Sequence, residues 1–324
     1  MHLRAPAFVR FLSSNAYPRI TVTHRPSQRE ADWAYGPFQS RAAAERYADE
    51  ALKLFLLRRC TDDLDPNPSH PGCVYSEMKM CLAPCYQGCS DERYGEEAAA
   101  VERFLATRGE SRLVTLRTER DEASARLEFE TAAAIHAQVQ RVESVRALAP
   151  ELVRPMSQLR AVVLQASAVP CEVAVFLYEN GALAGPASFS TLGMRIQNEQ
   201  SGSTSLFAHP MAVEAIPEAP TAEDGTSEVS PELNAAAPSK LARGVLEGRM
   251  EEALGALAEA TETPSVTVRQ GHLALLKRWY YRPETRRCGE IYFSDTEGRW
   301  QVKAMLRGVG RVAAKMLAAG GRAE

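Results

Sequence analysis

The chain has 324 residues, 45% of them hydrophobic, and is therefore long enough to bury more than one core. Its formal net charge of −3 and its pI near 6.2 exclude a protein that is basic throughout, so any nucleic-acid contact has to come from local patches. No apolar run approaches the roughly 18 residues of a membrane span and no hydrophobic signal peptide opens the chain, so we expect a cytoplasmic protein.

The first 59 residues predict a small α/β unit. Arg19–Thr23 alternates in the way that suits a strand, and Tyr35–Phe38, with its Gly-Pro pair, predicts a turn. Ser40 is expected to cap a helix that runs from Arg41 to about Leu57, because apolar residues recur there at helical spacing.

The segment 60–90 is rich in cysteine. Four thiolates close together in sequence suit an iron–sulfur cluster or a zinc ion, and disulfides are rare in the cytosol. Zinc sites usually show two short Cys-x2–4-Cys pairs and only one is present, whereas clusters tolerate irregular spacing, so the residues leave both metals open. The candidate ligands are Cys60, Cys73, Cys81 and Cys85; Cys89 lies four residues beyond, and Cys171 and Cys288 stand alone.

Residues 91–149 have a helical pattern almost throughout. Three apolar stripes follow one another, and Leu127–Glu130 between the last two is short enough for the turn of an αα-hairpin. An exposed phenylalanine at such a tip, flanked by carboxylates, would provide an aromatic anchor with a charged rim. The alternative is a helical pair that packs only on its own protein.

Several runs in this half resemble the central part of the UvrC family, the nuclease subunit of bacterial nucleotide-excision repair. They are YPRITVTHR, ADWAYGPFQS, LKLFLLRRC, CVYSEMKMCLAPC and ARLEFETAAAIHAQVQRVE, in order from about Tyr17 to Val145. The resemblance implies that residues 1–59 follow a GIY-YIG-type domain and that the four cysteines hold a [4Fe–4S] cluster, with zinc as the alternative.

The same resemblance makes the hairpin a UVR motif, the surface by which this family docks UvrB. The matching residues are Leu127, Glu128, Phe129, Glu130, Ala132, Ala133, Ile135, Gln138 and Val139. His136 and Ala137 stand where the family usually has arginine and aspartate, so part of the polar rim differs, and docking is expected to be weaker or to use another partner.

Residues 158–324 predict a C-terminal α+β domain and resemble no family. The expected elements are a strand in RAVVLQA, a hairpin of EVAVFLY and ALAGPASFS with a turn at Asn180-Gly181, a helix Leu241–Thr261, a strand SVTVR, a helix HLALLKRWYY, a strand GEIYFS and a C-terminal helix. Residues 211–239 are acidic, lack aromatics and predict a flexible linker. The whole chain is thus expected to be α+β and multidomain.

Two basic segments raise the question of DNA contact. Leu306–Leu317 fits a helix-hairpin-helix pattern in which Gly308, Gly310, Arg311 and Lys315 would bind phosphate, but we favour an amphipathic helix with basic exposed positions. Lys277–Arg282 interleaves cations with aromatics, for which we favour packing against a sheet over base stacking.

No nuclease centre is expected in this sequence. The tyrosines, arginine, glutamate and asparagine of a GIY-YIG site are not found, and the only aspartates after residue 158 are Asp224 and Asp295, so His209 and His272 are expected to be structural. We therefore expect a UvrC-like repair or DNA-processing factor that docks UvrB or a similar partner, with DNA as a further partner. The alternatives are a fragment or split subunit of an active excinuclease whose GIY-YIG domain is encoded upstream, and a metal-stabilised interaction protein outside repair.

Overall fold

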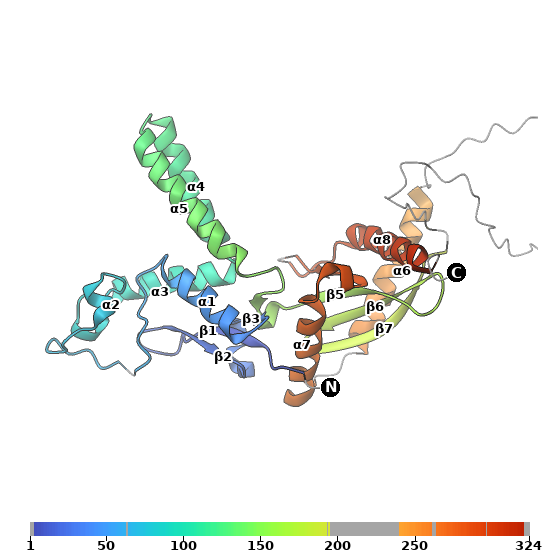
Figure 1. Ribbon diagram of the computed structural model, residues 1–324, viewed down its shortest axis with the longest axis horizontal. Helices are drawn as coiled ribbons and strands as arrows, with labels where there is room; N and C mark the ends of the chain where they lie inside the picture. The colour runs from blue at the N-terminus through green and yellow to red at the C-terminus, as the bar shows by residue number, and fades with distance from the viewer. Residues whose placement is uncertain are drawn as a thin grey trace, which may run out of the picture.

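The computed structural model describes residues 3–62, 64–192, 194, 240–260, 264–295 and 297–320. The chain forms two four-stranded antiparallel sheets, each with helices packed against it, and the segment around α2 (Val74–Glu77) lies beyond the first sheet (Figure 1). This arrangement agrees with the α+β class expected from the sequence. The expected linker 211–239 and His209 lie outside the described residues. None of the described helices is long and apolar enough to cross a membrane.

The first sheet has the strand order β2-β1-β3-β4, with β1 at Ala7–Phe11, β2 at Ile20–Thr23, β3 at Ala34–Phe38 and β4 at Arg154–Pro155. A 3-10 helix, η1 (Gln28–Trp33), connects β2 to β3. Helix α1 (Arg41–Leu52) packs on the sheet, and the Ala43 amide donates to Ser40 Oγ at 3.1 Å, so the predicted cap is confirmed.

The turn predicted at Tyr35–Phe38 is wrong, because these residues belong to strand β3. The reason for the glycine lies in packing: a Cβ at Gly36 would come within 2.5 Å of the Phe8 ring and 2.9 Å of the Ala7 carbonyl oxygen. Gly36 thus allows the neighbouring strand to approach closely. Strand β1 itself was not predicted.

Three helices form the middle of the chain, as the helical pattern predicted: α3 (Asp91–Ala106), α4 (Glu110–Ala125) and α5 (Phe129–Ala147). Helices α4 and α5 run side by side as an arm that projects away from both sheets (Figure 1). Only the base of the arm is buried with the first sheet and α1, through Leu113, Leu116, Val139, Val142 and Val145. The chain then returns to the first sheet as β4 and continues through a 3-10 helix, η3 (Met156–Gln158).

The second sheet has the order β7-β6-β5-β8, with β5 at Ala161–Ala166, β6 at Glu172–Glu179, β7 at Ala182–Ser190 and β8 at Gly289–Phe293. Helices α6 (Lys240–Glu259) and α8 (Val302–Gly320) pack on one face, where Val162 and Leu164 point. Helix α7 (Val266–Tyr280) packs on the other face with Ala161 and Val163. Both faces are covered, which explains the unbroken apolar run of β5.

The hairpin between β6 and β7 is confirmed, with Asn180 at φ 51° and Gly181 at φ 81° as a type I′ turn requires. The strand predicted in SVTVR is wrong. These residues start α7, where Ser265 Oγ accepts from the Val268 amide at 3.4 Å. The N-terminal cap overrides the β propensity of two valines, which is a weak preference.

Helix α7 also joins the two halves of the molecule. Lys277 is buried and its Nζ donates to the carbonyl oxygens of Arg4 at 3.1 Å and Ala5 at 3.3 Å, and the Tyr281 hydroxyl donates to the Pro37 carbonyl at 3.0 Å. Trp279 donates from its indole to Gln165 Oε1 at 2.6 Å. The packing role favoured for this basic and aromatic segment is therefore confirmed.

Candidate functional site

The cysteine segment lies beside α3 at the far end of the first unit, around the short helix α2 (Val74–Glu77) (Figure 1). Cys73 is the N-cap residue of α2, and Cys85 lies in a 3-10 helix, η2 (Pro84–Tyr86). Cys60 follows the last buried residues after α1, and Cys81 lies in the turn between α2 and η2. Each of the four cysteines therefore lies in a different type of local structure.

Electrostatics show that these four thiols are neighbours. Burial raises the pKa of the Cys81 thiol to about 11, opposed by the Ala83 amide, and negative charge on Cys60, Cys73 and Cys85 raises it further. Burial likewise raises the pKa of Cys85, with further increases from Cys73 and Cys60. Without a bound cation Cys81 and Cys85 are thus thiols at neutral pH, and a metal has to displace their protons.

The donor chemistry fits a metal–thiolate centre. All four side chains are soft sulfur ligands, and the Ala83 amide donates to Cys81 Sγ at 3.2 Å, a contact that suits a thiolate. No three His, Cys, Asp or Glu side chains in the described parts of the chain are gathered tightly enough to hold a single metal ion. The four cysteines therefore form a neighbourhood of ligands and not a closed coordination shell.

Cys89 differs from the other four. It packs against the hydrophobic core of the first unit, and its pKa is raised by burial and then by Asp91, with no contribution from the other cysteines. Sequence spacing alone did not show this separation.

The tip of the helical arm is exposed. Leu127 is 72% exposed and lies in the turn with φ 62°, and Phe129, 65% exposed, is the first residue of α5. Arg126 and Glu128 form an exposed ion pair at 2.9 Å beside them. All the residues predicted to bind a partner are exposed, namely Leu127, Glu128, Phe129, Glu130, Ala133 and Gln138.

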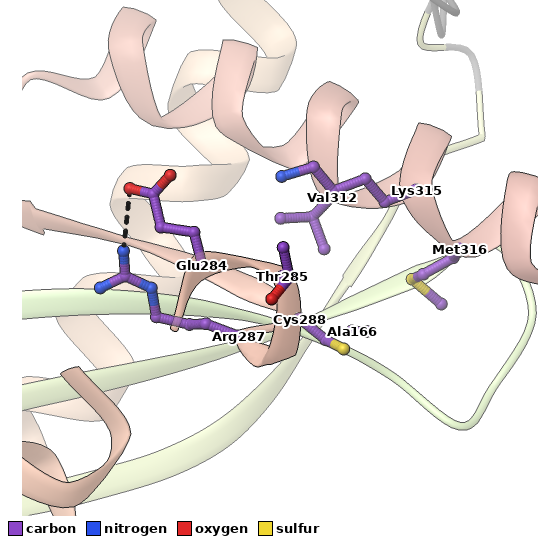
Figure 2. A pocket seen from close by; sticks show the side chains of 8 residues that line it. All are labelled: Ala166, Glu284, Thr285, Arg287, Cys288, Val312, Lys315 and Met316. Atoms are coloured by element: carbon purple, nitrogen blue, oxygen red, sulfur yellow. Dashed lines mark hydrogen bonds and ion pairs between the residues drawn. The ribbon is translucent and has the colours of Figure 1, made fainter. Parts of the chain in front are cut away.

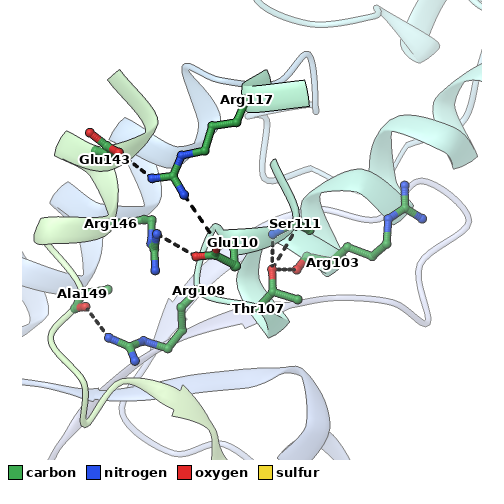
Figure 3. A network of polar contacts seen from close by, with 9 residues as sticks. All are labelled: Arg103, Thr107, Arg108, Glu110, Ser111, Arg117, Glu143, Arg146 and Ala149. Atoms are coloured by element: carbon green, nitrogen blue, oxygen red, sulfur yellow. Dashed lines mark hydrogen bonds and ion pairs between the residues drawn. The ribbon is translucent and has the colours of Figure 1, made fainter. Parts of the chain in front are cut away.

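The base of the arm is held by ion pairs (Figure 3). Glu110 at the start of α4 lies 2.9 Å from Arg146 and 3.9 Å from Arg117, and Arg117 also pairs with Glu143 of α5 at 2.9 Å. Next to them Arg108 donates to the Ala149 carbonyl at 3.5 Å. The network joins both helices of the arm at their fixed end, while the tip has no such support.

The predicted DNA-binding hairpin near the C-terminus is not formed. Gly308, Gly310, Arg311 and Lys315 all lie inside the single helix α8, so the segment is the helix that was favoured over the hairpin. Arg311 is held by Glu290 at 2.7 Å and by the Tyr292 hydroxyl at 2.9 Å. DNA contact by the cations of this helix stays a prediction.

The two glycines of α8 predict opposite effects on stability. A Cβ at Gly308 would overlap the Tyr292 hydroxyl and lie 2.8 Å from Glu290 Oε2, so Gly308→Ala is expected to destabilise the protein by about 1–3 kcal/mol. Gly310 has no atom within 4 Å of such a Cβ, so Gly310→Ala should stabilise by up to about 1 kcal/mol. Urea unfolding of both variants tests this. Equal effects of the two substitutions would contradict the packing of α8 on β8.

A cavity of about 500 Å³ lies where α8 crosses the ends of β5 and β8 (Figure 2). Lys315 and Met316 of α8 face Cys288 and the residues of a 3-10 helix, η4 (Glu284–Arg286), across it. Arg287 is already bonded to Glu284 at 3.4 Å and to the Tyr280 carbonyl at 3.0 Å. The cavity is thus mainly apolar and was not predicted from the sequence.

His272 and Asp295 have structural partners. His272 Nδ1 accepts from the Leu183 amide at 3.0 Å, and Asp295 accepts from the amides of Glu297 at 2.9 Å and Arg299 at 2.8 Å. The structural role predicted for His272 is confirmed by this contact.

Comparison with known proteins matches the regions just described. The family model "UvrC/Cho excinuclease, middle domain" matches residues 8–104, and "UvrB/uvrC motif" matches residues 110–145. The chain is 34% identical over 137 residues to UvrABC system protein C of Aliivibrio fischeri, and 35% identical over 136 residues to that of Yersinia pseudotuberculosis. It is 30% identical over 139 residues to that of Alcanivorax borkumensis.

These matches cover 42–43% of this chain and 22–23% of each relative, so the chain spans about a fifth of the length of the curated proteins that it matches. No solved structure matches it significantly. The matched residues include the cysteine segment and the whole helical arm. Residues 8–104 of this chain are thus similar to the middle domain of the UvrC/Cho excinucleases, and residues 110–145 are similar to the UvrB/uvrC motif.

Proposed function

We propose that the chain is a factor of DNA excision repair that docks a UvrB-type partner through the tip of its α4–α5 arm. The observation that carries this proposal is the exposure of Leu127 and Phe129 at the end of an arm whose base is buried with the first sheet. Large apolar side chains held on a rigid, protruding support are the usual anchors of small interfaces. The ion pair of Arg126 with Glu128 supplies a polar rim beside them.

The test is direct binding of the full chain to UvrB from the same organism, measured by biolayer interferometry. Saturable binding that depends on Phe129 supports the proposal. Absence of binding would overturn it. Binding that does not depend on Phe129 would favour an interaction through another surface.

We further propose that Cys60, Cys73, Cys81 and Cys85 hold a [4Fe–4S] cluster, with zinc as the other candidate. When bound, such a centre supplies folding free energy to the segment that ligates it. The segment needs this support, because Val74 and Met78 are 57% and 63% exposed and form no core. Iron, sulfide and zinc content of anaerobically purified protein tests the identity of the metal.

The chain's part in DNA cleavage is proposed to be positional and not catalytic. The acidic residues on the strands of the second sheet already have partners: Glu172 binds Ser188, Glu179 pairs with Arg160 at 2.7 Å, and Glu290 pairs with Arg311. A two-metal nuclease centre needs carboxylates free to bind the ions. This observation supports the proposal for the described part of the second sheet.

DNA contact is proposed for the exposed face of α8. Lys303, Arg307, Arg311 and Lys315 recur at intervals of four residues, so they lie along one side of the helix, and all four are exposed. Replacing Lys303, Arg307 and Lys315 with glutamine is expected to weaken DNA binding and to reduce its salt dependence. The slope of log K against log salt should fall by about 0.9 for each phosphate that the variant no longer neutralises.

Fluorescence anisotropy with a labelled duplex at several salt concentrations measures this effect. A control with the same charge change replaces Arg41, Lys53 and Arg93 of the first unit with glutamine. An equal change in slope for the control would show that the net charge of the protein, and not the α8 face, determines the salt dependence of DNA binding.

A further inference from the structure

Two arginines beside Cys60, one buried and one half-buried, form no ion pair with a carboxylate of the described residues. Arg58 is only 1% exposed, and its neighbour Arg59 has Nε and one terminal nitrogen shielded from solvent. A buried guanidinium that lacks an anionic partner is strongly unfavourable, because its loss of hydration is not compensated. Arg58 is such a group, and the shielded nitrogens of the half-buried Arg59 lie next to it in the chain, so both positions require an explanation.

The contacts of Arg58 are with neutral groups and a cysteine. Nε donates to the Tyr17 carbonyl at 3.0 Å, and Nη1 donates to the Asp62 carbonyl at 2.8 Å and to Cys60 Sγ at 3.5 Å. Nη2 is buried and has no hydrogen-bond partner. The backbone thus fixes this guanidinium in place, and the nearest group that is able to become an anion is the Cys60 thiol.

Arg59 lies on the other side of the same segment. Its guanidinium carbon is 5.7 Å from the centre of the Tyr75 ring, two residues after Cys73, and its buried nitrogens have no hydrogen-bond partner. No carboxylate of the described residues lies within 4.0 Å of either arginine. Arg58 thus contacts Cys60 and Arg59 lies against Tyr75, and neither forms an ion pair with a carboxylate of the described residues.

The charge of a metal–thiolate centre matches this pair. Four thiolates around a divalent zinc ion, or around the doubly positive core of a [4Fe–4S] cluster, leave a net charge of about −2. We infer that Arg58 and Arg59 are the buried counter-charges of the centre formed by the four cysteines, and that they govern its retention and, for a cluster, its reduction potential. This inference rests on the cofactor proposed above.

A direction for the potential follows from the charges. Reduction adds a negative charge to a cluster, and a nearby cation stabilises the reduced form. Removing the positive charge of Arg59 should therefore shift the reduction potential to more negative values. Removal of either charge should also speed the loss of metal to a chelator by about 10–100-fold, the range typical of groups that support metal ligands.

The experiment uses the full chain and the variants Arg59→Gln, Arg58→Gln and Arg58→Lys. Arg59 makes no hydrogen bond to the fold through its buried nitrogens, so Arg59→Gln separates charge from folding, and Arg58→Lys keeps the charge while removing the fork of contacts. Arg108→Gln is the matched control, because Arg108 also has a buried Nε without a partner and donates to a carbonyl, but it lies at the base of the arm.

The readouts are metal content, the rate of metal release to a chelator and, where iron is present, the potential from protein-film voltammetry. Faster release in Arg59→Gln and Arg58→Gln, with Arg58→Lys and Arg108→Gln near the wild type, supports the inference. Wild-type release and potential in Arg59→Gln would overturn it, as would equal losses in Arg58→Lys and Arg58→Gln. A wild-type protein without iron or zinc refutes the proposed cofactor instead.

Discussion

Phe129→Ala should weaken binding of a UvrB-type partner by at least about 30-fold, the effect of losing an interface anchor worth about 2 kcal/mol or more. The side chain is 65% exposed in the free protein, so its removal should leave the free energy of unfolding within about 0.5 kcal/mol of the wild type. Biolayer interferometry measures the affinity, and urea unfolding measures the stability.

Val114→Ala provides the matched control. Val114 is 56% exposed on α4 of the same arm, and it lies toward the base and away from the tip. Equal weakening by both substitutions would show that general surface apolarity matters and would contradict a docking site at the tip. Unchanged binding of Phe129→Ala would contradict it as well.

Cys81→Ser should abolish metal binding and unfold the segment from Cys60 to Cys85. Negative charge on each of the other three cysteines raises the pKa of the Cys81 thiol, and a bound cation would relieve this repulsion. Apparent binding free energies of structural zinc in small peptides are about 10–16 kcal/mol, which shows how much folding free energy such a centre is able to supply. Metal content and hydrogen exchange of residues 60–85 are the measurements.

Cys89→Ser is the control for this experiment. Its thiol packs against the hydrophobic core and does not interact with the four, so the variant should keep its metal and its exchange protection. A Cys81→Ser protein that keeps both, or a Cys89→Ser protein that loses metal equally, would show that the ligand set is wrong.

Sequence patterns predicted those elements in which local chemistry and tertiary packing agree. The Asn180-Gly181 turn needs positive φ at both positions, and Ser40 has a hydroxyl that accepts from the first turn of α1. The helical arm followed from its apolar stripes. In each case the deciding interaction lies within a few residues of the chain.

Predictions failed where a distant contact decides the structure. The missing side chain of Gly36 leaves room for the Phe8 ring of a neighbouring strand, and that of Gly308 leaves room for the Tyr292 hydroxyl. Neither glycine marks a turn. The buried arginines were missed for the same reason. Arg58 and Arg59 belong to a run that was noted for its cysteine, and only the three-dimensional structure shows that they have shielded nitrogens and form no ion pair with a described carboxylate. Spacing in the sequence predicts ligands but not the charges that surround them.

The pairing of β3 with β4 brings the two ends of the region between them to one place on the first sheet. Tyr35 lies opposite Pro155 and Gly36 opposite Arg154, so the chain leaves the first sheet and re-enters it on adjacent strands. Neighbouring strands lie about 4.8 Å apart, which fixes the two ends of the excursion at one place. Helix α1 and the base of the arm also pack on the first sheet, so the region between the two strands is joined to the sheet through its core as well as at its ends.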